Sequence, residues 1–218
     1  MSERVSIPIA IFEVTSEYAR PDLRLLMDRV RVVEALFEAF KPWDIKVDDI
    51  EVVSEGKPSE QGIKFKLSTK RISFFVGAGS CKFTHDNANW ESAEETIKIL
   101  SLGLDTLIEV NKIKVAAYKT AIAMHLQPKS LPFIEILKPF APSSLAKLDS
   151  SPIKAVASVV KWEKRRITID GSGQLANGVF LKFEREFEGS ISFNEMALRL
   201  KADEDELFDI LGIEEDLS

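Results

Sequence analysis

The chain has 218 residues, of which 45% are hydrophobic and 29% are charged. This is the composition of a folded globular protein and is far from that of a disordered chain. Its 29 Lys and Arg residues against 35 Asp and Glu residues give a formal net charge of −6. Such a balance supplies no general attraction for phosphate backbones, so we expect nucleic acid to be an unlikely partner.

Cys81 is the only cysteine, which excludes an intramolecular disulfide and a Cys-rich zinc site. The apolar run 5–14 contains Ser6, Pro8 and Glu13 and resembles a strand more than a signal peptide. No stretch reaches the roughly 20 apolar residues that span a bilayer. We therefore expect a soluble, cytoplasmic protein without a membrane partner.

In the first half, alternating apolar residues predict a strand over 4–14. A single amphipathic helix is expected from Pro21 to Pro42, because apolar residues recur every three or four positions. Its predicted buried stripe consists of Leu23, Leu26, Val30, Val33, Phe37 and Phe40. A short strand over 50–53, a hairpin of 62–68 with 71–76 and a short return near Cys81 follow. Ser92 and Glu95 form an S-x-x-E capping box that predicts the start of a second helix.

The second half opens with a long strand candidate over 113–126, although its Ala-rich run leaves a helix as the alternative. Four prolines between 128 and 142 allow only a short helix near 133–137. Strands are expected over 153–162, 166–169 and 179–187. Ser192 and Glu195 make a second capping box before a terminal helix.

Both halves thus follow the order strand, helix, three or four strands, helix. We predict an α+β fold with largely antiparallel sheet and helices packed on one face. Two interpretations of its organisation remain open: two tandem β-α-β(3–4)-α halves, 1–110 and 111–218, or one continuous domain. The order of elements over 62–126 resembles that of uncharacterised bacterial proteins of similar size, which implies no activity.

The densest polar loop, 84–90, precedes a helix, where unpaired backbone N–H groups favour anions. His85, Asp86 and Trp90, together with His125, are therefore the candidate ligand-binding residues. Turn formation, capping and packing are the alternative explanation for this loop. Neither histidine belongs to a spaced metal motif, so we expect that no metal site exists and that the two histidines do not share a transition metal.

Four basic residues surround Trp162 in the segment 161–166. A nucleic acid base could stack on the indole, but such charges on an edge strand more often prevent aggregation. No glycine pattern matches a nucleotide-binding loop, so we expect no cofactor. Cys81 is expected to be a buried structural residue.

In the acidic C-terminal helix, one stripe carries Leu207, Phe208 and Leu211. These residues either close the chain's own core or bind a partner. The chain is rich in patterned structure and poor in reactive constellations. We therefore predict a non-catalytic protein-interaction or regulatory module whose partner is another protein or a second copy. The alternatives are a small-molecule binder with an apolar pocket between helix and sheet, and an enzyme that uses carboxylates or His85 and His125.

Overall fold

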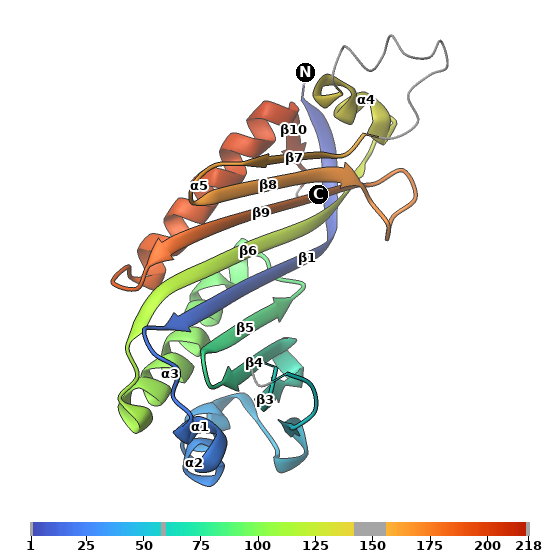
Figure 1. The fold of residues 1–218 in the computed structure, drawn as a ribbon. Coiled ribbons are helices and arrows are strands. Elements are labelled where there is room, and N and C mark those ends of the chain that lie inside the picture. Colours follow the sequence, from blue (N-terminus) through green and yellow to red (C-terminus); the bar gives the residue numbers. More distant parts are fainter. Residues whose placement is uncertain (1, 58–59, 142–155, 217–218) are drawn as a thin grey trace. The chain divides into compact units, whose positions relative to one another are not determined.

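The computed structural model describes residues 2–57, 60–141 and 156–216. They divide into two compact units: unit 1 contains residues 1–10, 121–185 and 197–218, and unit 2 contains residues 11–120 and 186–196. Four elements, labelled in Figure 1, contain residues of both units: β1 (Glu3–Tyr18), β6 (Val115–Pro128), β9 (Val179–Glu188) and α5 (Phe193–Leu211). The described strands are ten in number, and nearly all of their pairings are antiparallel.

In unit 2, strands pair in the order β2-β3-β4-β5-β1, and each pair is antiparallel. The new elements are β2 (Ile50–Val53), β3 (Gly62–Leu67), β4 (Ile72–Gly77) and β5 (Ser80–Asp86). Alternation in β3 and β4 places Phe65 and Phe74 on the buried face, where both side chains are fully buried. Arg71 adopts a φ of 54°, which turns the chain between the two strands.

The helices of unit 2 are α1 (Arg24–Met27), α2 (Arg29–Phe40) and α3 (Ala93–Asn111). Helices α2 and α3 cover one face of the sheet. The Phe40 ring meets the Phe65 and Phe74 rings edge to face, with centroids 6.0 and 5.7 Å away. Gly103 of α3 allows this close approach, because a Cβ there would lie 2.9 Å from Cζ of Phe40 and 3.1 Å from the Phe74 ring.

The opposite face of this sheet carries paired charges. Ion pairs join Glu13 to Lys82 at 2.5 Å and Glu51 to Lys66 at 2.9 Å across neighbouring strands. This solvated face is the outward half of the alternating pattern. Single 3₁₀ turns connect the elements: η1 (Lys41–Trp43), η2 (Val47–Asp49), η3 (Ser68–Lys70), η4 (Trp90–Ser92) and, in unit 1, η5 (Lys138–Phe140).

In unit 1, β10 (Ile213–Glu215) pairs with β1 in parallel, and β1 is followed by β6, β9, β8 (Arg165–Gly171) and β7 (Ser158–Lys161). A short helix, α4 (Phe133–Leu137), follows β6. The buried stripe of α5 includes Leu200, Leu207 and Leu211. Asp203 of α5 accepts two hydrogen bonds from the Arg185 guanidinium of β9, at 2.9 and 2.7 Å.

The predicted α+β class, with helices packed on largely antiparallel sheet, is confirmed. Residues 115–128 form a strand and not the alternative helix. One capping box is wrong: Ser92 makes no side-chain cap, since Asn89 accepts the Ser92 N–H and Glu95 instead binds Lys70 and Trp43. In the second box, the Glu195 N–H donates to the Ser192 hydroxyl at 3.2 Å.

Within each sequence half, the first strand pairs with the last strand of its antiparallel run, β1 with β5 and β6 with β9. The compact units do not coincide with the halves 1–110 and 111–218. The structural duplication, which superposition of the halves would test, stays a prediction. Residues 153–155 of the expected strand 153–162 lie outside the described residues.

Candidate functional site

Three large apolar side chains are exposed where the first helical region of unit 2 begins. Leu23 is 63% exposed, Met27 85% and Val30 67%. The Met27 N–H bonds to the Leu23 carbonyl at 3.3 Å, so these two residues lie one helical turn apart. We call the three residues the α1–α2 apolar face. Single exposed apolar residues are ordinary, but several close together mark an interaction site.

A break between α1 and α2 explains why this face points to solvent. Asp28 has a φ of −108° and a ψ of 62°, which ends α1, and α2 begins at Arg29. The buried side of α2 carries Val32, Leu36 and Phe40. The sequence predicted one continuous helix with Leu23 and Val30 in its buried stripe. That prediction is wrong for these two residues, because the break changes which positions face the sheet.

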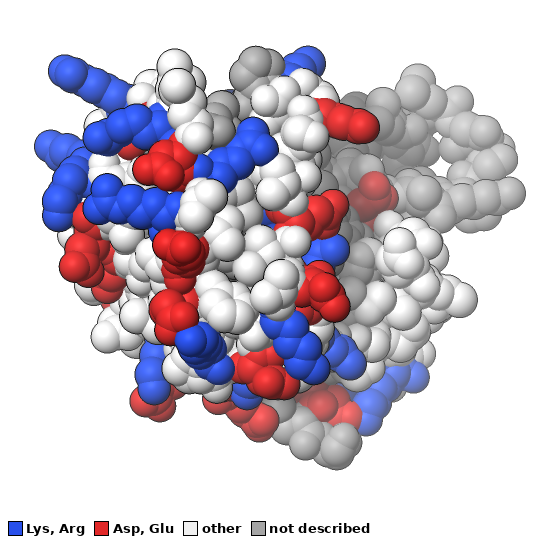
Figure 2. All heavy atoms as spheres, turned by 90° about the horizontal axis from the view of Figure 1, so that it is seen from below, with Lys and Arg blue, Asp and Glu red and all other residues white. Residues whose placement is uncertain are grey.

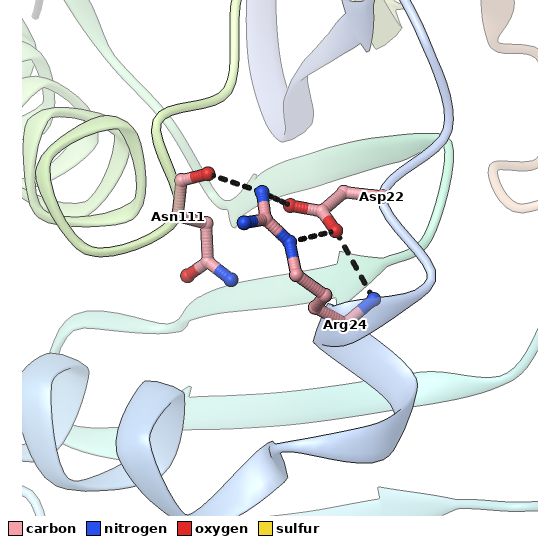
Figure 3. A network of polar contacts seen from close by, with 3 residues as sticks. All are labelled: Asp22, Arg24 and Asn111. Carbon is pink, nitrogen blue, oxygen red and sulfur yellow. Dashed lines mark hydrogen bonds and ion pairs between the residues drawn. The ribbon is translucent and has the colours of Figure 1, made fainter.

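A polar network fixes α1 against the end of α3 (Figure 3). The Arg24 guanidinium donates to the Asp22 carboxylate at 2.8 and 2.7 Å and to the backbone carbonyl of Asn111 at 2.8 Å. Asn111 is the last residue of α3, and a cation bound to C-terminal carbonyls also interacts favourably with the helix dipole. Arg24 therefore joins α1 to α3.

Asp22 adds a second anchor to the same segment. Its backbone N–H donates to the Ala78 carbonyl at 2.7 Å, beside the β4–β5 turn, and its carboxylate accepts the Arg24 N–H at 3.0 Å. Hydrogen bonding by Arg24 lowers the pKa of Asp22 below its ordinary value, so the carboxylate stays charged at neutral pH. The apolar face thus belongs to a backbone that is held at both α3 and the sheet.

The segment that carries the α1–α2 apolar face has a small excess of positive charge. Residues 20–31 contain four arginines and two aspartates, a net charge of +2 in a chain of net charge −6. Arg20 and Arg31 are exposed. Figure 2 views the end at which α1 and α2 lie in Figure 1, and there uncharged surface lies among charges of both signs. The face can contribute apolar contact flanked by guanidinium groups.

The side chains of His85 and Asp86 lie on opposite faces of β5, as successive residues of a strand do. His85 is buried with its Nδ1 3.0 Å from the Thr96 hydroxyl, and burial lowers its pKa. Since the Thr96 hydroxyl donates to the Ser92 carbonyl at 2.9 Å, it can accept from His85 Nδ1–H. Asp86 is exposed and Trp90 half-buried in η4. The ligand-binding role predicted for these residues stays a prediction.

His125 belongs to unit 1, whereas His85 belongs to unit 2. The His125 Nδ1 lies 2.8 Å from the Ser172 hydroxyl, and the centroid of the His125 ring lies 5.0 Å from that of the Phe180 ring. The Ser172 oxygen also accepts backbone N–H groups of Gln174 and Leu175, at 3.1 and 2.9 Å. With its acceptor sites used, Ser172 donates to His125 and organises the 172–178 loop. Within the described ranges, no group of three or more His, Cys, Asp or Glu residues is placed to hold a metal.

Cys81 is buried between Ser16 and Tyr18, and burial raises its pKa to about 11. The thiol is therefore protonated at neutral pH and unsuited to nucleophilic attack. In the C-terminal helix, Leu207 and Leu211 are buried within this chain and Phe208 is half-buried. Their role in binding a partner stays a prediction.

No protein-family model matches the chain, and no curated protein matches it. Among solved structures, it is similar to a rolling circle replication initiator protein from Geobacillus stearothermophilus. The identity is 8%, the match covers 84% of this chain and 76% of that chain, and the TM-score is 0.35. Among the residues that the structure describes, no helix has both the length and the apolar character needed to cross a membrane.

This comparison corrects the expectation about partners. The net charge led us to expect nucleic acid to be an unlikely partner, and that expectation is wrong, because the comparison finds similarity to a replication initiator. At this TM-score the likeness carries no argument for what the chain binds.

Sequence reasoning missed the α1–α2 apolar face. The segment 20–31 carries four arginines among apolar residues, but this pattern fits an uninterrupted amphipathic helix and does not reveal the break at Asp28.

Proposed function

We propose that this chain is a non-catalytic protein-interaction module that docks a partner protein on the α1–α2 apolar face. The exposure of Leu23, Met27 and Val30 on an anchored backbone carries the proposal. Burying one such side chain fully contributes roughly 1.5–3 kcal/mol. Three exposed apolar side chains within one short segment therefore offer a gain large enough to offset part of the cost of association.

The partner that fits this face has an apolar groove with carboxylates at its rim. Met27 suits such a groove, because an unbranched thioether adapts to irregular apolar surfaces. Arg20 and Arg31 are exposed beside it and complement acidic groups. The Arg24–Asp22 ion pair keeps α1 in place, so little backbone ordering is needed on binding.

The experiment begins with a photoreactive residue at position 30 of the full chain, which identifies the partner by cross-linking in the native host. The same residue at position 198 is the matched control, since Leu198 is 73% exposed on α5. Binding to the purified partner is then measured for Met27→Asp and Leu198→Asp. We expect Met27→Asp to weaken binding at least about tenfold, because it removes an apolar contact. Leu198→Asp should have no effect.

Equal affinity of both variants would contradict the proposal, provided that their melting temperatures match that of the unchanged chain. Anionic lipid vesicles and a single-stranded oligonucleotide of mixed sequence serve as two further probes. If either of them binds the chain and Met27→Asp abolishes that binding, the face serves that ligand and the protein-partner proposal is wrong.

A further inference from the structure

The outer edge of β7 is unpaired among the described residues, since β7 is the last strand in the order of unit 1. Strand β7 pairs with β8 in an antiparallel register that sets Val160 opposite Ile167 and Lys161 opposite Arg166. The Trp162 N–H donates to the Arg165 carbonyl at 2.8 Å, which marks Trp162 and Arg165 as a hydrogen-bonded pair.

This hydrogen bond fixes the direction of every backbone group in β7. Hydrogen-bonded and non-hydrogen-bonded pairs alternate along an antiparallel ladder. Val160 therefore bonds to β8, whereas the N–H and C=O groups of Val159 and Lys161 point away from β8. These four groups form a row of donors and acceptors along the outer edge.

The side chains along this edge are apolar and exposed. Val159 is 57% exposed, Val160 44% and Trp162 51%. Strand β7 is only four residues long, but an exposed edge that carries apolar side chains can still template pairing with another chain. An edge that combines free backbone groups with exposed apolar side chains is the arrangement that β-strand addition uses.

The two faces of the edge differ in chemistry. Ile167, opposite Val160, shares its face with Ile169, which is 4% exposed and faces the core. Lys161, opposite Arg166, lies on the other face together with Val159. Arg166 pairs with Glu184 at 3.6 Å, whereas Lys161 has no carboxylate partner in the described part of the chain. An added strand would thus place apolar side chains beside Val160 and an acidic side chain beside Lys161.

We infer that the edge of β7 binds an extended polypeptide segment in which apolar and acidic residues alternate. The added strand pairs its backbone with Val159 and Lys161. A lysine on the edge disfavours pairing with a second copy of this chain and favours a strand that carries carboxylates. This surface belongs to unit 1 and does not depend on the α1–α2 apolar face of unit 2.

The first test uses the full chain and a short fluorescent peptide of alternating Val and Glu. We expect saturable binding by fluorescence anisotropy, and a loss of about tenfold for Lys161→Glu, since an attractive cross-strand pair becomes repulsive. A peptide of alternating Val and Lys should show the opposite preference between the two proteins. If Lys161→Glu associates with itself and no peptide binds either protein, the lysine only protects the edge and the inference is wrong.

The second test addresses the backbone. Proline at position 159 removes an outward N–H without removing a bond to β8, whereas Val159→Ala keeps that N–H. We expect Val159→Pro to abolish peptide binding and Val159→Ala to retain it. Hydrogen exchange should slow at the Val159 and Lys161 amides when the peptide binds. Binding that survives Val159→Pro, or protection confined to other amides, would overturn the inference.

Met27→Asp distinguishes this inference from the proposed function. The variant should bind the Val and Glu peptide unchanged, because Met27 lies on the other interaction face. Binding that is lost in Met27→Asp and kept in Val159→Pro would assign the peptide to the α1–α2 apolar face and overturn the β7 site.

Discussion

Replacement of Leu207 by alanine tests whether the stripe of α5 closes the chain's own core. Leu207 is 3% exposed, and Leu200 and Leu211 are buried along the same helix. Ile210 of the same helix is 60% exposed and provides a matched control. Both substitutions remove a large aliphatic side chain from the same helix, so they differ mainly in burial.

The expected loss in free energy of unfolding is several-fold larger for Leu207→Ala than for Ile210→Ala. Truncation of a buried leucine to alanine costs about 2–5 kcal/mol, through lost transfer energy and the cavity that remains. An exposed substitution typically changes the free energy of unfolding by no more than about 0.5 kcal/mol. For a chain of this size, 1 kcal/mol shifts the melting temperature by about 2–4 °C. Leu207→Ala should therefore lower it by roughly 4–20 °C.

Thermal unfolding followed by circular dichroism, at one protein concentration and ionic strength, measures both variants. Deletion of residues 203–218 should also lower the melting temperature, since it removes Leu207 together with the Asp203 that binds Arg185. The reasoning is refuted if Leu207→Ala and Ile210→Ala shift the melting temperature equally. In that case the stripe does not close this core, and the alternative role in binding a partner gains support.

Two further predictions concern unit 2. Gly103→Ala should lower the free energy of unfolding, measured by urea titration, by about 1–3 kcal/mol through overpacking, because its Cβ would lie 2.9 Å from the Phe40 ring. Gly79→Ala should be neutral in the same titration, because a Cβ at position 79 would have no atom within 4 Å. His85 has a pKa lowered by burial from its ordinary 6.5, although nearby Asp86 and Glu95 oppose this shift. Stability should fall as pH drops below 6.5, because the unfolded chain takes up a proton that the folded chain resists. His85→Gln should reduce that dependence in unfolding titrations, and an unchanged slope would contradict the assigned cause.

Local alternation explains why the sheet was predictable. In β3 the apolar residues alternate with lysines, and in β4 Ile72, Phe74 and Val76 occupy every second position. Strand β3 ends one residue before its predicted bound, and β4 begins and ends one residue after its predicted bounds. A period of two leaves only one way to bury such a segment against helices. The short α4 was also predicted at its observed bounds, since prolines limit it on both sides.

The α1–α2 apolar face was not predictable by the same reasoning. Helical periodicity records which residues share a face only while the helix is continuous. Asp28 interrupts the helix without a proline or glycine beside it, so no local signal marked the break. The Arg24 contact with the Asn111 carbonyl spans 87 residues of sequence, and no pattern in the chain encodes it.

The two proposed binding surfaces share one feature, which is a backbone held in place by polar contacts. An exposed apolar residue contributes to binding only after the cost of ordering its backbone has been met. In α1 that order comes from Arg24, held by Asp22 and Asn111. In the β7–β8 hairpin it comes from Arg165, which lies 3.3 Å from Asp203 of α5. Both surfaces therefore present apolar side chains beside an arginine whose charge is already engaged. Other exposed cations, which have no carboxylate partner among the described residues, can attract an acidic partner: Arg20 and Arg31 on one surface and Lys161 on the other.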